Sequence, residues 1–216
     1  MSPETVYLRI GSRTSRLALW QTDRIIQLLR RHFPALHCEV VPIVTEGDRN
    51  LVTPLPALGG KGVYTCELED RLRTGEIDLA VHSLKDLPVE APDGIEVAAI
   101  CDRVDVRDGL VANQGWTLGT LPHAAVVGTC SLRRQAQLLA LRPDLTVTQI
   151  RGNVPSRIEK VRRGEYDATI LAAAGLLRLG LAHEATEWFA LDAMLPAPGQ
   201  GALAVQCRSE DAGTRA

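Results

Sequence analysis

Several features that mark whole classes of protein are missing from this sequence. None of its 216 residues belongs to an apolar run of membrane-spanning length, and the first residues lack the basic and apolar regions of a signal peptide. The five cysteines form no Cys-x-x-Cys pair, and no histidine stands at zinc-ligand spacing from them. We therefore expect a cytoplasmic protein with reduced thiols, without a membrane partner or a metal site.

Aromatic residues are also scarce, at 4%, and this bears on how the charges are interpreted. Residues 128–163 carry seven Arg and one Lys against Asp144 and Glu159, whereas residues 64–108 carry twelve acids against five bases. No aromatic side chain that could stack on a base lies between those arginines, so we expect no nucleic-acid partner. Bidentate binding of small carboxylates or phosphates suits clustered arginine better.

Strand and helix patterns alternate along the chain. An apolar strand at residues 6–10 precedes an amphipathic helix that ends near Pro34. Further strands are expected at 38–44, 77–81, 95–100, 125–128, 146–150 and 201–207. This alternation predicts an α/β protein with mixed, mainly parallel sheets flanked by helices.

The second half of the chain repeats the first in two places. Residues 125–131 lead into a helix as residues 8–15 do, and Arg-Gly-Glu-Tyr-Asp-Ala at 163–168 repeats Thr-Gly-Glu-Ile-Asp-Leu at 74–79. In the latter pair, Gly-Glu ends a helix and Asp opens a strand. The two echoes predict two similar lobes, and a cleft between lobes is the usual place for a small ligand.

One strand end gathers three ionisable side chains. The apolar run at 77–81 ends in His82, Lys85 and Asp86 before Pro88 closes the segment. Open α/β sheets place their chemistry at such ends, although Asp86 would also suit a simple turn before the proline. Asp86 is the one acid that the sequence places among the expected cations, where it would stay ionised and relay protons.

Three strand ends are followed by helix starts that carry arginine. Ser15 and Ser131 stand at two of these starts, where free backbone N–H groups attract anions, although N-capping alone would also explain both serines. The arginines beside the starts are Arg13, Arg133, Arg134, Arg151 and Arg157. Their convergence predicts an anion-binding cleft.

Seven segments of the chain resemble the porphobilinogen deaminase (hydroxymethylbilane synthase) family, in the family's order. They are Arg9–Gln21, 59–62, Val81–Pro88, Val127–Arg134, Arg151–Asn153, Ala172–Gly180 and 198–202. The resemblance implies two lobes like those of type II periplasmic binding proteins. It places domain 1 at residues 1–101 plus 202–216 and domain 2 at 107–195.

The resemblance also implies a monomeric transferase of tetrapyrrole (porphyrin, haem) biosynthesis. Such an enzyme joins four porphobilinogen molecules head to tail into hydroxymethylbilane and releases ammonia each time, on a dipyrromethane cofactor. Asp86 matches the family's catalytic aspartate, which contacts pyrrole N–H groups and stabilises positive charge. The residues expected to bind substrate or cofactor are Arg13, Ser15, Lys61, Lys85, Thr129, Ser131, Arg133, Arg134, Arg151, Gly152, Arg157 and Gln200.

Two departures from the family pattern stand out. The family has a third domain with a glycine-flanked cysteine that anchors the cofactor, and none of the five cysteines has that context. Cys130 lies near the expected cleft, and we interpret it as a small packing residue rather than a substitute anchor. Ala57 replaces a lysine found in many relatives. The chain is then either a fragment or a naturally shortened protein of doubtful activity alone, and a non-catalytic binding protein for organic polyanions is the alternative.

Overall fold

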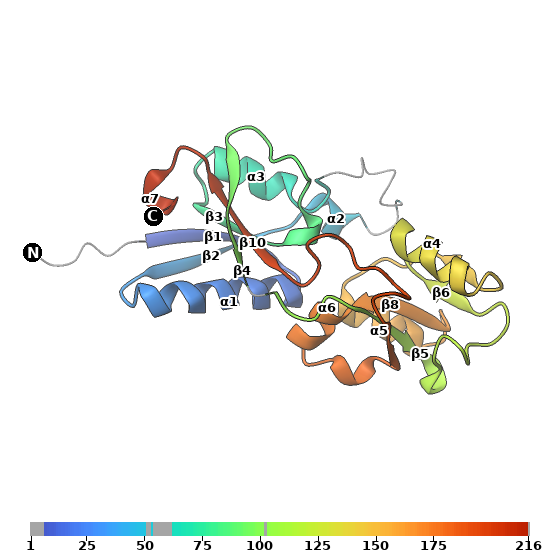
Figure 1. Ribbon diagram of the computed structural model, residues 1–216. Coiled ribbons are helices and arrows are strands. Elements are labelled where there is room, and N and C mark those ends of the chain that lie inside the picture. Colours follow the sequence, from blue (N-terminus) through green and yellow to red (C-terminus); the bar gives the residue numbers. More distant parts are fainter. Residues whose placement is uncertain (1–6, 51–52, 54–61, 102, 216) are drawn as a thin grey trace, which may run out of the picture. The chain divides into compact units, whose positions relative to one another are not determined.

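A computed structural model describes residues 7–50, 53, 62–101 and 103–215. Over these residues the chain divides into two compact units (Figure 1): unit 1 contains residues 7–50, 62–101 and 202–215, and unit 2 contains residues 53 and 103–201. The expectations for Ala57 and Lys61 lie outside the described residues. Within the described ranges, no helix combines the length and apolar character needed to cross a membrane.

Unit 1 is built on a five-stranded sheet in the order β2-β1-β3-β10-β4. Its elements are β1 (Tyr7–Arg13), α1 (Arg16–His32), β2 (His37–Ile43), α2 (Glu46–Arg49), α3 (Cys66–Arg73), β3 (Leu79–Ser83), the 3₁₀ turn η2 (Leu84–Asp86), β4 (Ile95–Cys101), β10 (Leu203–Arg208) and α7 (Ala212–Arg215). Strands β2, β1 and β3 are parallel, and β10 runs antiparallel to both β3 and β4.

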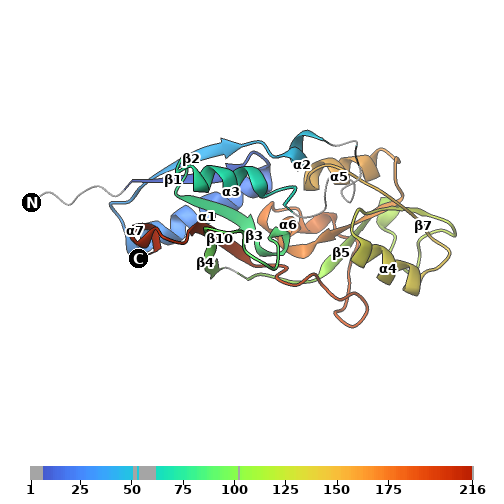
Figure 2. The ribbon, with the colours of Figure 1, turned by 90° about the horizontal axis from the view of Figure 1, so that it is seen from above.

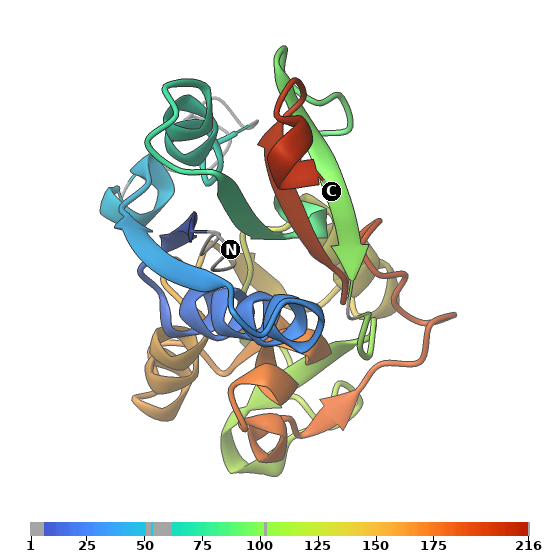
Figure 3. The ribbon, with the colours of Figure 1, turned by 90° about the vertical axis from the view of Figure 1, so that its left-hand side faces the viewer.

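Helices α1 and α3 cover opposite faces of this sheet (Figure 3). Helix α1 starts where the Ser15 side chain accepts a hydrogen bond from the Ala18 N–H at 3.2 Å, and its apolar stripe buries Ile25 and Ile26. On the other face, Leu68 and Leu72 of α3 are fully buried. The sheet is thus fixed from both sides, which holds the ends of its strands in place.

Unit 2 has a sheet in the order β7-β6-β8-β5-β9. Its elements are β5 (Asp108–Ala112), η3 (Asn113–Gly115), β6 (Val126–Gly128), α4 (Leu132–Leu141), β7 (Thr146–Thr148), α5 (Val154–Arg162), β8 (Ala168–Ala172), α6 (Ala173–Arg178), η4 (Ala182–Glu184) and β9 (Glu187–Trp188). Helices α4 and α5 lie on opposite sides of its strands (Figure 2), and Leu138 and Ile158 bury their apolar faces.

The repeated Gly-Glu-x-Asp segments have the same structure in both units. Gly75 and Gly164 both adopt positive φ, +71° and +75°, the left-handed conformation that ends a helix at little cost in glycine. The Asp78 carboxylate accepts the Arg9 N–H at 2.8 Å, and the Asp167 carboxylate accepts the Val126 N–H at 2.7 Å. Each aspartate therefore joins two neighbouring parallel strands at their start.

The expected α/β fold with two similar units is confirmed, and the structure refines its details. In each sheet two of the four described strand pairings are parallel and two antiparallel, because β10 and β5 return against β3 and β8. Strand β1 runs on to Arg13, beyond the expected end at residue 10, since its ladder with β2 continues to Ile43. Strand β7 ends at Thr148 rather than at residue 150.

Candidate functional site

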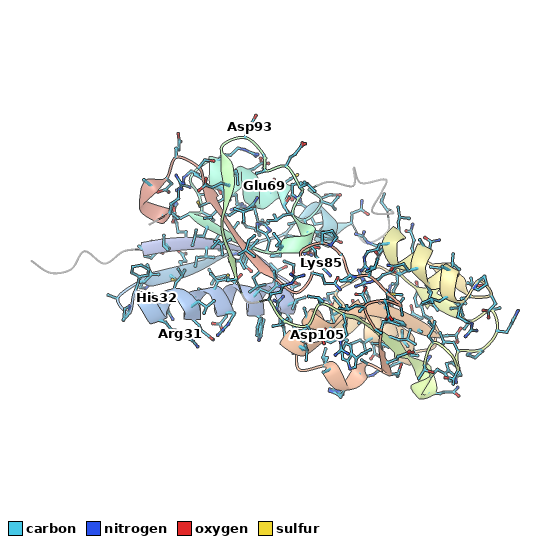
Figure 4. The ribbon with its side chains drawn as sticks, in the orientation of Figure 1. Arg31, His32, Glu69, Lys85, Asp93 and Asp105 are labelled. Carbon is cyan, nitrogen blue, oxygen red and sulfur yellow. The ribbon has the colours of Figure 1, made fainter. Side chains whose placement is uncertain are left out.

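A pocket lies in unit 1 where β1 and β3 end. It is lined by Arg13, Ser15, Leu17, Ala18, Gln21, Tyr64, Val81, His82, Ser83 and Asp86. Asp86 ends the 3₁₀ turn η2, which the Leu87 N–H closes onto the Leu84 carbonyl at 3.2 Å, and its side chain is exposed. The pocket therefore brings the predicted carboxylate together with Arg13 and Ser15. Lys85 lies in the same turn, half-buried (Figure 4).

Arg13 is held in the pocket by an acid and a ring. Its Nε and Nη2 donate to Asp48 at 2.9 and 2.5 Å, and its guanidinium carbon lies 4.1 Å from the centre of the Tyr64 ring. Burial lowers the pKa of Arg13, but the Asp48 hydrogen bond and charge outweigh burial and raise it overall. No hydrogen bond to Nη1 occurs within the described part of the chain, so this edge of the guanidinium can take a ligand carboxylate.

His82 forms a neutral part of the pocket wall. Burial, and then the nearby charge of Arg13, lower its pKa to about 4, so the imidazole is uncharged at neutral pH. Its neighbour Ser83 accepts a 2.8 Å hydrogen bond from the Gln21 side chain, which ties β3 to α1. Acidic, cationic and neutral polar groups thus meet at one strand end.

In unit 2, two predicted arginines converge on a buried carboxylate. Asp108 is fully buried at the start of β5, and it accepts Nη2 of Arg133 and Nη2 of Arg134, both at 2.7 Å. Burial raises the pKa of Asp108, but the charges and hydrogen bonds of the two arginines lower it overall. Gln200 donates to the same carboxylate at 2.9 Å, so three predicted site residues share one acceptor.

Arg134 is nearly enclosed, whereas Arg133 is partly open. The Arg134 side chain is 8% exposed, donates Nη1 to the Ile170 carbonyl at 3.0 Å, and leaves Nε buried without a partner among the described residues. The Arg133 side chain is 24% exposed and also donates to the Leu195 carbonyl. Arg133 is therefore the more accessible of the two for a ligand carboxylate.

The remaining predicted residues of unit 2 lie at the ends of β6 and β7. Ser131 caps α4 by accepting the Arg134 N–H at 3.4 Å, and the buried Thr129 accepts the Ser131 N–H at 3.2 Å. Gly152 has φ of +117°, and its carbonyl accepts Nε of Arg157 at 2.8 Å. Arg151, just before this glycine, is 7% exposed.

The sequence interpretation missed the acids that hold the arginines. The expectation that Asp86 is the one acid among the cations is wrong, because Asp48 binds Arg13 and Asp108 binds Arg133 and Arg134. Both lie far along the chain from their partners, and Asp108 resembles an ordinary strand-opening residue. The Cys130 thiol donates to the Ile150 carbonyl at 3.0 Å, which is consistent with a packing residue.

Solved structures that resemble this chain have low sequence identity to it. One is a putative lipoprotein from Actinomyces odontolyticus, at a TM-score of 0.58 and 12% identity, with 98% of this chain and 89% of that chain covered. Another is the periplasmic aliphatic sulphonate binding protein SsuA from Escherichia coli, at a TM-score of 0.52 and 17% identity, with 96% and 63% covered. These similarities support the fold alone.

Sequence comparison identifies the family. Residues 8–216 match the family model described as porphobilinogen deaminase, dipyromethane cofactor binding domain. The chain is 49% identical over 208 residues to a porphobilinogen deaminase of Geobacter sulfurreducens, and it spans 96% of its own length and 65% of that relative's. The chain therefore belongs to the porphobilinogen deaminase family.

Proposed function

We propose that the protein joins four porphobilinogen molecules head to tail into hydroxymethylbilane and releases one ammonia molecule for each. The observation that carries this proposal is the exposed Asp86 carboxylate in the same pocket as Arg13, in a chain of the porphobilinogen deaminase family. A carboxylate is suited to a reaction in which positive charge develops on a pyrrole as an amine leaves. A guanidinium suits the carboxylate side chains of the same substrate.

A dipyrromethane cofactor fits the donors and acceptors of the unit 1 pocket. Two linked pyrroles carry acetate and propionate groups together with N–H donors, and the pocket offers Arg13 and Ser15 for the former and Asp86 for the latter. When bound, the cofactor supplies the free α-carbon on which the chain of pyrroles grows. Unit 2 offers further groups for acetates and propionates: Thr129, Ser131, Arg133, Arg134, Arg151, Gly152, Arg157 and Gln200. Lys61 and Lys85 complete the proposed set.

Each pocket residue then has a distinct task. Asp86 accepts a pyrrole N–H, stabilises positive charge next to its carboxylate and moves the proton that the ring loses. Arg13 binds a substrate carboxylate through the edge that Asp48 leaves open, and the ion pair with Asp48 fixes its orientation. Ser15 presents the start of α1, where backbone N–H groups favour an anion.

The domain boundaries and the cellular setting belong to the same proposal. We infer domain 1 at residues 1–101 plus 202–216 and domain 2 at 107–195; the division of the described residues into two units supports this. We infer further that the protein is a cytoplasmic monomer without a nucleic-acid or membrane partner, in keeping with its composition and with a small-molecule substrate.

The test is Asp86→Asn in the full-length gene product, with Asp93→Asn as its control. Asp93 is an exposed acid in the loop before β4, well away from Lys85 (Figure 4). Ammonia release and tetrapyrrole formation from porphobilinogen should fall roughly 100-fold or more in Asp86→Asn, the scale of general acid–base catalysis, and stay unchanged in Asp93→Asn. A wild-type protein that binds porphobilinogen but releases no ammonia would instead be a polyanion-binding protein.

A further inference from the structure

Three polar side chains are buried together on the α3 face of the unit 1 sheet. Glu69 and His82 are each 5% exposed and Gln206 is 1% exposed. The Gln206 amide donates to the Glu69 carboxylate at 3.2 Å, and the Gln206 side chain also interacts with the His82 ring. In the sheet register, Gln206 lies opposite Ala80, two residues before His82, so all three side chains share one face. We name this group the polar trio.

Unit 2 contains the same three positions, and it fills them with apolar side chains. Strand β3 pairs with β1 as β8 pairs with β6, which makes Leu171 the counterpart of His82. Val111 faces Thr169 as Gln206 faces Ala80, and Ile158 precedes Gly164 by the same number of residues as Glu69 precedes Gly75. The counterparts of the polar trio are therefore Ile158, Leu171 and Val111, which pack together in one hydrophobic cluster.

The fold does not require polar groups at these positions, because unit 2 is built without them. Buried polar groups cost free energy unless their hydrogen bonds are complete, and apolar side chains of similar size are usually at least as stabilising. His82 Nε2 and Gln206 Oε1 are both buried, and neither has a hydrogen bond of standard geometry within the described residues. Because burying these polar groups costs folding free energy, the polar trio needs an explanation in function rather than in stability.

The orientation of the Gln206 amide indicates where the His82 proton lies. The Gln206 amide nitrogen is turned toward Glu69, so its oxygen is the atom left for the His82 ring, and an amide oxygen only accepts. We assign the contact to His82 Nε2, because that atom and Gln206 Oε1 are both buried without another partner in the described part of the chain. Nε2 then carries the hydrogen, and Nδ1 of the neutral ring carries a lone pair.

We propose that His82 Nδ1 is a second ligand-binding acceptor of the pocket, beside Asp86, that accepts an N–H group of the bound pyrrole. His82 lines the same pocket as Asp86 and Arg13. Gln206 and Glu69 act behind it as positioning residues, since they hold the ring in one tautomer. This inference rests on the proposed function, because it names the ligand as an N–H heterocycle with carboxylate side chains.

A neutral imidazole at this position accepts a hydrogen bond without adding the negative charge that a second carboxylate would bring. A carboxylate in place of His82 would compete with the ligand for Arg13, whereas a neutral imidazole adds an acceptor without changing the charge of the pocket. Among the charged groups of unit 1, Arg13 from β1 acts on the ring directly, Asp86 of η2 lines the same pocket, and Glu69 from α3 binds Gln206 behind the ring. The pocket can then select for N–H groups with His82 and for carboxylates with Arg13 independently.

The first test replaces His82 by its unit 2 counterpart. His82→Leu should fold, with an unfolding temperature somewhat below that of the wild type because the buried Gln206 Oε1 loses its partner, and its affinity for porphobilinogen, measured by calorimetry, should fall about 10-fold or more. His82→Asn, whose side-chain oxygen lies near the position of Nδ1, should retain affinity within about threefold. The matched control is His32→Leu, at the exposed end of α1 (Figure 4), which should bind as the wild type does.

The second test reads the tautomer in the wild-type protein and does not depend on any variant folding. Two-bond ¹H–¹⁵N NMR spectra of the His82 ring should show a hydrogen on Nε2 and a lone pair on Nδ1, and the Nδ1 resonance should move when porphobilinogen is added. A hydrogen on Nδ1, an Nδ1 resonance unmoved at saturating porphobilinogen, or wild-type affinity in His82→Leu would each overturn the inference. If Asp86→Asn loses activity while His82→Leu binds normally, only this inference fails. If the wild type does not bind porphobilinogen, the proposed function and the inference both fail.

Discussion

The two units share one frame and differ in what they place at its strand ends. Their sheet orders correspond strand for strand, and one aspartate joins β3 to β1 in unit 1 as another joins β8 to β6 in unit 2. In unit 1 the strand ends carry an exposed acid, Asp86, beside a cation and a neutral imidazole. In unit 2 they carry arginines drawn together by the buried Asp108.

The difference shows how one architecture supports two kinds of chemistry. In unit 1, Asp48 binds the side of Arg13 away from Nη1, and the second acid, Asp86, is exposed and forms no ion pair within the described residues. In unit 2, the acid Asp108 is buried and orients Arg133 and Arg134, of which Arg133 remains partly exposed. The sheet of each unit holds the strand ends in place, and one acid in each unit, the partly exposed Asp48 or the buried Asp108, orients the arginines.

The largest effect is expected from removing the buried acid of unit 2. Asp108→Ala leaves Arg133 and Arg134 without their shared carboxylate, and breaking a buried ion pair from one side typically costs about 3–5 kcal/mol of unfolding free energy. Hydrogen exchange followed by mass spectrometry would show which strands lose stability. Peptides of β6 and β8 should exchange much faster, while those of β1 and β3 stay protected.

A matched substitution in the same unit sharpens this prediction. Asp105 also pairs with an arginine, Arg107, but that pair is open to solvent, so Asp105→Ala should cost far less than Asp108→Ala. Equal losses in the two variants would mean that the Asp108 pairs do not organise the arginines of unit 2. Faster exchange in β1 and β3 would mean that the two units do not respond separately.

The next largest effect is a pH dependence of the unfolding free energy, which His82 should cause and its apolar counterpart Leu171 cannot. The His82 pKa is about 4 in the folded protein against an ordinary 6.5, because burial and Arg13 disfavour the charged ring. Between these values the unfolded chain binds a proton that the folded chain does not, so stability falls as pH drops from 6.5 to 4. The full shift is worth roughly 3 kcal/mol.

Chemical unfolding at several pH values checks this prediction. Carboxylates paired with arginine, such as Asp78 and Asp108, lose most of their contribution below their ordinary pKa of 3.8, and only the start of that loss, from about pH 5, falls within this window. His82→Leu should therefore flatten the dependence between pH 6.5 and 4. An unchanged slope in that variant would show that His82 is not the titrating group.

Particular residues show how much of the fold could be predicted from the sequence. The repeat at 74–79 and 163–168 predicted similar units because helix ends and strand starts are set by local chemistry, glycine at positive φ and aspartate on a neighbouring N–H. The antiparallel return of β10 beside β3 depends on a pairing across more than a hundred residues, and its apolar pattern alone does not fix a neighbour.

The site shows the same division between local and distant causes. Arg13, Ser15 and Asp86 follow from strand ends and helix starts, and they share one pocket. The acids that orient these arginines, Asp48 and Asp108, could not be predicted from such local patterns, because only the folded chain brings them to their arginines. The polar trio could not be predicted from the sequence for another reason. A polar residue in an apolar strand is recognised as buried only when it is known that both faces of the strand are covered.

The smallest effect concerns the two helix caps, the feature most alike in the two units. Ser15 accepts the Ala18 N–H at 3.2 Å and Ser131 accepts the Arg134 N–H at 3.4 Å. Replacing either by alanine should cost about 1 kcal/mol, with the longer bond of Ser131 giving the smaller loss, whereas glycine at either position should cost only a few tenths. Amide exchange in the first turns of α1 and α4 measures both. If Ser131→Gly weakens porphobilinogen binding at nearly unchanged stability, while Ser15→Gly leaves both binding and stability nearly unchanged, the Ser131 hydroxyl binds the ligand and is more than a cap.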